Sequence, residues 1–104
     1  MLLDRNRYSL LLDYYDVLLT QHQVDILKEY LNEDLSMNEI AENLMISKSA
    51  VQDLIKRTLN QLDTYEKKLK LLEKETRLDE ILEQMEAEDS ELLNKYVKII
   101  RKTK

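Results

Sequence analysis

The sequence predicts an all-α protein, and two observations lead to this expectation: its composition and the spacing of its apolar residues. None of its 104 residues is glycine or proline, so the residues that most often form tight turns or end helices are absent. Apolar residues instead recur at three- and four-residue spacing, which places them on one face of an α-helix. We therefore expect a single helical domain over residues 1–104, with short polar connections.

The first helix is expected at about residues 4–19, and a second helix follows it. Thr20 and Gln23 form a capping box, in which each side chain bonds the backbone amide of the other residue and so starts a helix. The apolar positions that predict the inward face of the first helix are Tyr8, Leu11, Leu12, Tyr15, Leu18 and Leu19. Those of the second helix are Val24, Leu27, Tyr30 and Leu31.

Two short helices with a tight turn are predicted between Leu35 and Arg57, in LSMNEIAENLMISKSAVQDLIKR. Ser36 and Glu39 form another capping box, and Ser47 is a favourable N-cap for the second of these helices. Because so few residues separate them, the two helices must cross steeply, as in a helix-turn-helix. The expected inward residues are Ile40, Ala41, Leu44, Ala50, Val51, Leu54 and Ile55.

The last of these helices has no stop signal after Arg57, so we expect it to continue to about Lys74. It would then span roughly 40 Å, more than a small core can cover. The helix-turn-helix core is placed at about 20–62 and a C-terminal helical extension at about 63–104, with further helices near Leu78 and after Asp89 or Ser90. A leucine and tyrosine stripe in the long helix is predicted to be core or homodimer interface: Leu62, Tyr65, Leu69 and Leu72.

Charge is segregated along the chain, although the net charge is only −5. Residues 79–91 carry seven acids and no base, whereas residues 92–104 carry five bases and no acid. We interpret this as neutralisation within the chain or across a dimer. The alternative is that the basic terminus contacts RNA or DNA.

The residue types that support catalysis or metal binding are scarce. There is no cysteine, no glycine-rich phosphate loop, and one histidine, His22, which is predicted to be a surface or capping-region residue. The acidic residues 79–91 lack the glycine and the alternating ligands of an EF-hand loop. We therefore expect no enzyme activity, no metal and no cofactor. No apolar run reaches the length of a membrane span, and the charged N-terminus does not resemble a signal peptide, which favours the cytoplasm.

The order of these pieces resembles region 4 of bacterial sigma factors and, more closely, the YlxM family of small sigma-like proteins. The resemblance covers about two thirds of the chain. It is carried by Leu19-Thr20-x-x-Gln23, Leu35-Ser36, Glu39-Ile40-Ala41-Glu42, Ser47-x-x-Ala50-Val51, Ile55-Lys56-Arg57-Thr58 and Tyr65-Glu66-x-Lys68-Leu69. It implies a cytoplasmic bacterial regulator associated with the signal recognition particle pathway.

The helix-turn-helix predicts a nucleic-acid-binding face, because the early residues of its second helix enter the major groove. The candidates are Lys48, Ser49, Gln52, Lys56 and Arg57. Two residues depart from that expectation: Asp53 repels phosphate, and Met45 occupies a turn position that related proteins commonly fill with glycine or asparagine. We expect a homodimeric DNA-binding regulator with duplex DNA as its partner. The alternatives are a protein- or ribonucleoprotein-interaction module, or a structural homodimer.

Overall fold

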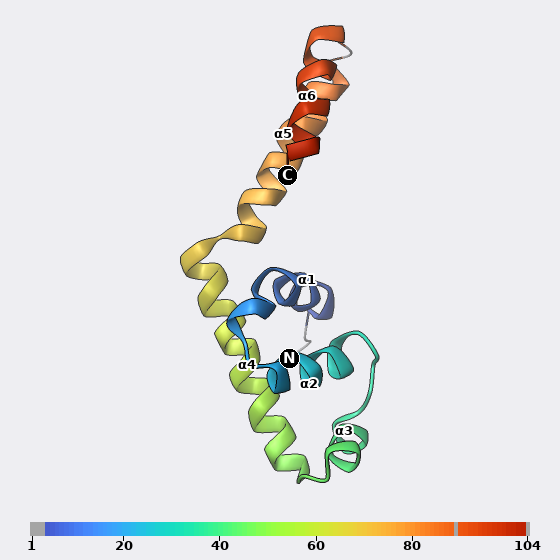
Figure 1. The fold of residues 1–104 in the computed structure, drawn as a ribbon, viewed down its shortest axis with the longest axis vertical. Coiled ribbons are helices and arrows are strands. Elements are labelled where there is room, and N and C mark those ends of the chain that lie inside the picture. Colours follow the sequence, from blue (N-terminus) through green and yellow to red (C-terminus); the bar gives the residue numbers. More distant parts are fainter. Residues whose placement is uncertain (1–3, 89, 104) are drawn as a thin grey trace. The chain divides into compact units, whose positions relative to one another are not determined.

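The computed structural model describes residues 4–88 and 90–103, and the described residues form helices and no strand (Figure 1). The predicted all-α class is confirmed. The elements are α1 (Arg5–Tyr15), the short 3-10 helix η1 (Asp16–Leu18), α2 (Gln21–Leu31), α3 (Met37–Leu44), α4 (Lys48–Leu69), α5 (Leu71–Ala87) and α6 (Glu91–Thr103). The chain divides into two compact units, Met1–Leu72 and Glu73–Lys104.

The predicted caps start α2, α3 and α4. Thr20 Oγ1 accepts from the Gln23 amide at 3.2 Å, and Gln23 Oε1 accepts from the Thr20 amide at 3.0 Å. Ser36 and Glu39 form the same reciprocal pair at α3. Ser47 Oγ accepts from the Ala50 amide at 3.0 Å and caps α4. Each cap satisfies backbone donors that would otherwise have no partner inside the helix.

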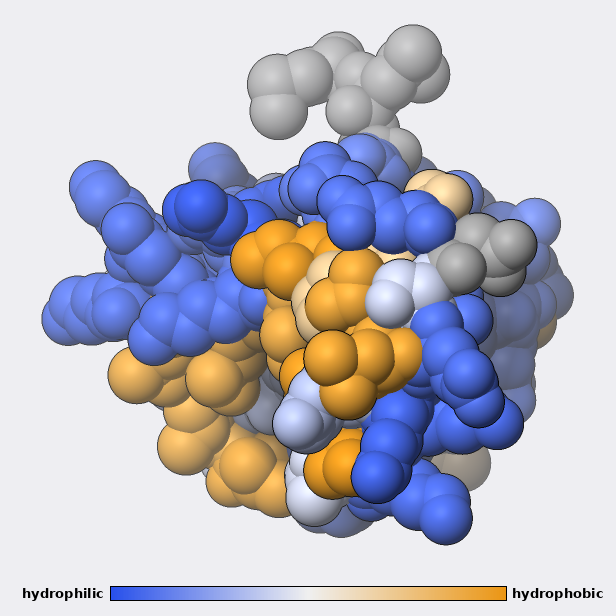
Figure 2. Space-filling model, turned by 90° about the horizontal axis from the view of Figure 1, so that it is seen from above, coloured by the Kyte–Doolittle hydropathy of each residue, from blue (hydrophilic) through white to orange (hydrophobic). Residues whose placement is uncertain are grey.

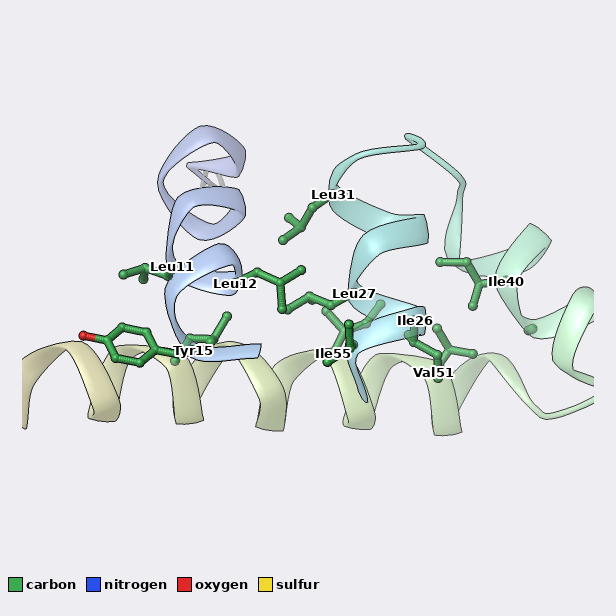
Figure 3. Close-up of a cluster of buried hydrophobic side chains, with 12 residues drawn as sticks. Leu11, Leu12, Tyr15, Ile26, Leu27, Leu31, Ile40, Val51 and Ile55 are labelled. Atoms are coloured by element: carbon green, nitrogen blue, oxygen red, sulfur yellow. The ribbon is translucent and has the colours of Figure 1, made fainter. Parts of the chain in front are cut away.

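The core of the first unit is a cluster of buried aliphatic side chains and one buried tyrosine, and helices α1, α2 and α3 pack it against α4 (Figure 3). Because α4 contributes to the cluster along much of its length, it serves as the spine of the unit. The buried members are Leu11, Leu12, Tyr15, Val24, Ile26, Leu27, Leu31, Ile40, Ala41, Val51, Ile55 and Leu62.

The first helix ends earlier than predicted. It stops at Tyr15, and the 3-10 turn of η1 follows, so Val17 and Leu18 are exposed although Leu18 was expected to face inward. The backbone of Leu19 is extended, with φ −108° and ψ 159°. Thr20 is extended too, with φ −70° and ψ 156°, as an N-cap residue requires, so residues 19 and 20 separate η1 from α2.

The prediction that α4 continues to Lys74 is also wrong. It ends at Leu69, and Lys70 adopts the left-handed conformation with φ 56° and ψ 34°. The Tyr15 hydroxyl donates to Glu66 Oε1 at 2.7 Å and accepts from the Leu71 amide at 3.1 Å. Glu66 Oε1 also accepts from the Leu72 amide at 3.1 Å. These bonds satisfy the first amides of α5, so a contact with α1 fixes the break.

The second unit consists of α6 and most of α5. Leu82 of α5 and Val97 of α6 are its buried hydrophobic residues among those described. Ser90 Oγ accepts from the Leu93 amide at 3.4 Å, as the predicted cap requires, whereas Asp89, the other predicted cap, lies outside the described residues. Within the described ranges, none of the helices is both long enough and apolar enough to cross a membrane.

Candidate nucleic-acid interface

The turn between α3 and α4 is closed by a left-handed residue. Met45 has φ 58° and ψ 40°, and the Ile46 amide donates to the Ala41 carbonyl at 3.1 Å. Hydrogen bonds of this kind commonly end a helix when the residue is glycine or asparagine. A side chain with a Cβ makes this conformation about 1–2 kcal/mol less favourable. The Met45 side chain is 94% exposed, so its own packing offsets little of that cost.

Burial on one side of α4 determines which side faces solvent. Val51 and Ile55 are buried in the core, together with Ile40 and Ala41 of α3. Ala50 was predicted to face inward, but it is exposed. At 100° per residue, Ala50 lies about 140° around α4 from Ile55, so it falls outside the buried arc.

All five predicted site residues are exposed. Ser49, Gln52 and Lys56 follow one another at spacings of three and four, so they share one side of α4, which we call the outer face. Lys48 lies in the first turn, between this face and the core, and Arg57 lies on the far edge. The structure therefore brings together three of the five candidates and places the other two beside them.

The outer face also contains residues that weigh against or extend the prediction. Asp53 is exposed and adjacent to Gln52 in sequence, so it brings negative charge to this surface. Asn60 is exposed one turn beyond Lys56 on the same side, and sequence reasoning missed it. Its position four residues after Lys56 was the available signal.

The charges around the turn balance each other. The exposed cations Lys48, Lys56 and Arg57 lie on α4. The exposed acids are Glu39 and Glu42 of α3 and Asp53 of α4. At the start of α4, Lys48 adds to the partial positive charge of the helix N-terminus, and the first turn has no acid.

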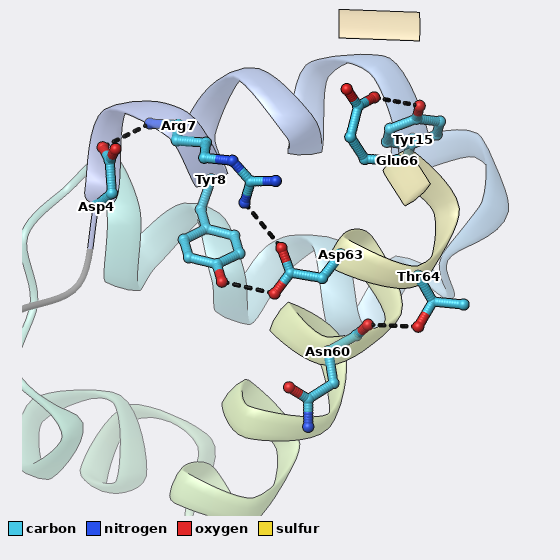
Figure 4. A network of polar contacts seen from close by, with 8 residues as sticks. All are labelled: Asp4, Arg7, Tyr8, Tyr15, Asn60, Asp63, Thr64 and Glu66. Atoms are coloured by element: carbon cyan, nitrogen blue, oxygen red, sulfur yellow. Dashed lines mark hydrogen bonds and ion pairs between the residues drawn. The ribbon is translucent and has the colours of Figure 1, made fainter. Parts of the chain in front are cut away.

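A polar network further along α4 fixes α1 in place (Figure 4). Asp63 accepts from Arg7 Nη1 at 2.7 Å through one oxygen and from the Tyr8 hydroxyl at 2.7 Å through the other. The hydrogen bond to Asp63 raises the pKa of both Arg7 and Tyr8. These three residues had no role in the predicted site, and their contacts orient α1 on α4.

The remaining predicted residues have structural positions. Leu62 is buried in the core, which is one of the two roles predicted for its stripe, and Tyr65 and Leu72 are partly buried against that core. Leu69 is exposed. His22 is exposed in the first turn of α2. Across the described part of the chain, no group of three or more histidine, aspartate or glutamate side chains is arranged to hold a metal ion.

Comparison with known proteins agrees with this geometry. The family model UPF0122, described as "Putative helix-turn-helix protein, YlxM / p13 like", matches residues 2–102. A UPF0122 protein of Clostridium perfringens is 46% identical over 85 residues, which cover 82% of this chain and 76% of the relative. One from Malacoplasma penetrans is 38% identical over 104 residues, covering 98% of this chain and 97% of the relative.

Proposed function

The chain belongs to the UPF0122 family of YlxM/p13-like helix-turn-helix proteins, and from this premise we propose that it is a cytoplasmic regulatory protein that binds duplex DNA. The proposed contact surface is the outer face of α4 together with Lys48 and Arg57. The major groove would receive the start of α4, as it receives the second helix of other helix-turn-helix proteins.

One observation carries the proposal: Gln52 and Lys56 on the outer face and Lys48 in the first turn are all exposed, in the first half of a helix whose Val51 and Ile55 are buried in the core. Glutamine can bond adenine through two hydrogen bonds, and lysine can bond guanine or a phosphate. Because the helix is held by Val51 and Ile55, these side chains would meet DNA without a rearrangement of the core. The exposed Asp53 sets a limit on how closely α4 approaches the phosphates.

The test is fluorescence anisotropy of a labelled duplex titrated with the full chain at several salt concentrations. We expect Lys48→Ala and Lys56→Ala each to weaken binding and to reduce the slope of log K against log salt by about one. Asp53→Asn is expected to strengthen binding, because it removes a charge that repels phosphate.

Lys67→Ala and Lys68→Ala are the matched controls, since both lysines are exposed on the same helix near its other end. They should leave the affinity nearly unchanged. The proposal is overturned if no duplex binds at low salt, or if the four lysine variants weaken binding equally.

A second candidate function is an interaction module that acts on a protein or ribonucleoprotein. The acids Glu39, Glu42 and Asp53 beside the turn and the net charge of −5 favour it, because each lowers affinity for phosphate. The resemblance to the YlxM family suggests the signal recognition particle as this partner. Immobilised chain would be exposed to the particle's protein and RNA and, separately, to random duplex. Capture of the particle alone would favour this second function.

A further inference from the structure

Helix α6 leaves part of its apolar surface uncovered. Val97 is 2% exposed, and Leu93 and Ile100 are partly buried. In contrast, Leu92 is 62% exposed, and Tyr96 and Ile99 are each 51% exposed. Leu92, Tyr96 and Ile99 follow one another at spacings of four and three, so they form one continuous line on the helix. We call them the α6 stripe. Figure 2 shows hydrophobic side chains gathered between hydrophilic ones on the face that it displays.

The ion pair inside the second unit lies away from the α6 stripe. Arg101 bonds Glu86 Oε1 through Nε at 2.9 Å and through Nη2 at 2.7 Å. At 100° per residue, Arg101 is about 180° around α6 from the middle of the stripe. The charged contact therefore covers one side of α6 and leaves the apolar side open.

The charges of α6 are ordered along its length. Glu91 begins the helix, and Glu88 precedes it. Lys95 is exposed near its middle, and Lys98, Arg101 and Lys102 are exposed in its second half. Tyr96 lies near the midpoint between Glu91 and Lys102. A second α6 that runs antiparallel, with the two Tyr96 side chains at the centre, would place each Glu91 opposite the Lys102 end of the other helix. A parallel arrangement would place like charges together.

We propose that a second copy of this chain docks on the α6 stripe with its own α6 antiparallel. The interface would be isologous, because each residue then meets its complement on the other copy. Leu92 would pack near Ile99 of the other helix, and the acidic and basic ends would attract each other. Antiparallel helix dipoles add to this attraction. The surface differs from the stripe at residues 62–72 that the sequence suggested, and the inference does not depend on DNA binding.

The association is tested by sedimentation equilibrium of the full chain over micromolar to near-millimolar concentrations. We expect a dimer of 12.5 kDa chains, and we expect Tyr96→Asp to weaken the association at least tenfold. Val17→Asp is the matched control, because Val17 is also an exposed apolar residue but lies on η1; it should not change the association. Circular dichroism of each variant checks that the helices are retained.

Charge reversal tests the antiparallel register. Glu91→Lys and Lys102→Glu should each weaken the dimer, and the two changes combined should restore most of the affinity. A chain that stays monomeric at all concentrations overturns the proposal, as does a double variant that is no tighter than the single ones. Flotation with vesicles of anionic lipid tests the alternative that α6, as a basic amphipathic helix, binds a membrane surface. Vesicle binding by a chain that does not dimerise would also overturn it.

Discussion

The two compact units differ in how much apolar surface they bury. Among the described residues, twelve buried hydrophobic side chains of the first unit form one cluster from four helices. The second unit, Glu73–Lys104, buries Leu82 and Val97. A segment shorter than about 40 residues seldom has enough core to fold by itself. The comparison indicates that the first unit is stabilised mainly by its own core, whereas the core of α5 and α6 is too small to stabilise that hairpin by itself.

The largest expected effect comes from truncating a core leucine in each unit. We expect Leu27→Ala to destabilise the first unit by about 2–5 kcal/mol, because it removes buried methyl groups and leaves a cavity. Leu82→Ala should reduce the helicity of the hairpin and leave the first unit almost unchanged. Five of the six tyrosines lie before residue 72, so tyrosine fluorescence during urea unfolding reports on the first unit, and circular dichroism reports on both.

The comparison fails if Leu82→Ala lowers the tyrosine-detected midpoint as much as Leu27→Ala does. The two units would then unfold as one cooperative body. Equal urea m-values from the two signals in the unmodified chain would indicate the same.

The next effect concerns the contact between α1 and the start of α5. Tyr15→Phe removes the bonds to Glu66 and to the Leu71 amide, and we expect a loss of about 1–3 kcal/mol. Burial is the main cause that raises the pKa of Tyr15, and the hydrogen bond to Glu66 raises this pKa further. The hydroxyl stabilises the fold fully below the ordinary tyrosine pKa, about 10. This contribution is lost as pH rises through the higher pKa of the folded state.

Thermal unfolding between pH 8 and 11 measures this dependence. The unmodified chain should lose stability above pH 10 more steeply than Tyr15→Phe does. The Phe variant serves as the control, because it retains every lysine and the other tyrosines. Parallel curves for the two proteins would show that Tyr15 has no part in the alkaline transition.

The smallest expected effect is a gain in stability when a residue in the left-handed conformation is replaced by glycine. Met45→Gly should stabilise the first unit by about 0.5–1 kcal/mol, because glycine adopts positive φ without the steric cost of a Cβ. Met45→Ala is the control; it should be nearly neutral, since the Met45 side chain is exposed and alanine retains the Cβ. Lys70→Gly tests the same cost where α4 meets α5. The melting temperatures of the three variants measure the cost of a Cβ at these positions. Equal values for the alanine and glycine variants at residue 45 would contradict the argument.

The starts of helices could be predicted from the sequence better than their ends. Thr20, Ser36 and Ser47 cap α2, α3 and α4 as expected, because a cap depends on residues within one turn. The break at Lys70 could not be foreseen, since it depends on a tyrosine 55 positions earlier and no glycine or proline marks it. The periodic pattern there favours a continuous helix. Only the folded chain brings Tyr15 to the Leu71 amide.

The candidate site could also be predicted only in part. The exposure of Gln52 and Lys56 could be predicted, because helical periodicity places them away from the buried side. That of Lys48 follows from its place in the first turn of α4. The placement of Ala50 could not be predicted reliably, because it depends on how wide an arc of α4 the other helices cover. Asp63 was not anticipated as a partner of Arg7 and Tyr8, because those residues are separated by more than 50 positions.

These separations have a consequence for the order in which the protein is made. The bonds between α1 and the residues around Asp63 and Leu71 join positions 51 to 56 apart in the chain. At about 5–20 residues per second, the ribosome adds Glu66 roughly 3–10 s after Tyr15. An isolated helix as short as α1 is marginal in water. These particular contacts of α1 can therefore form only after the end of α4 and the start of α5 have been translated.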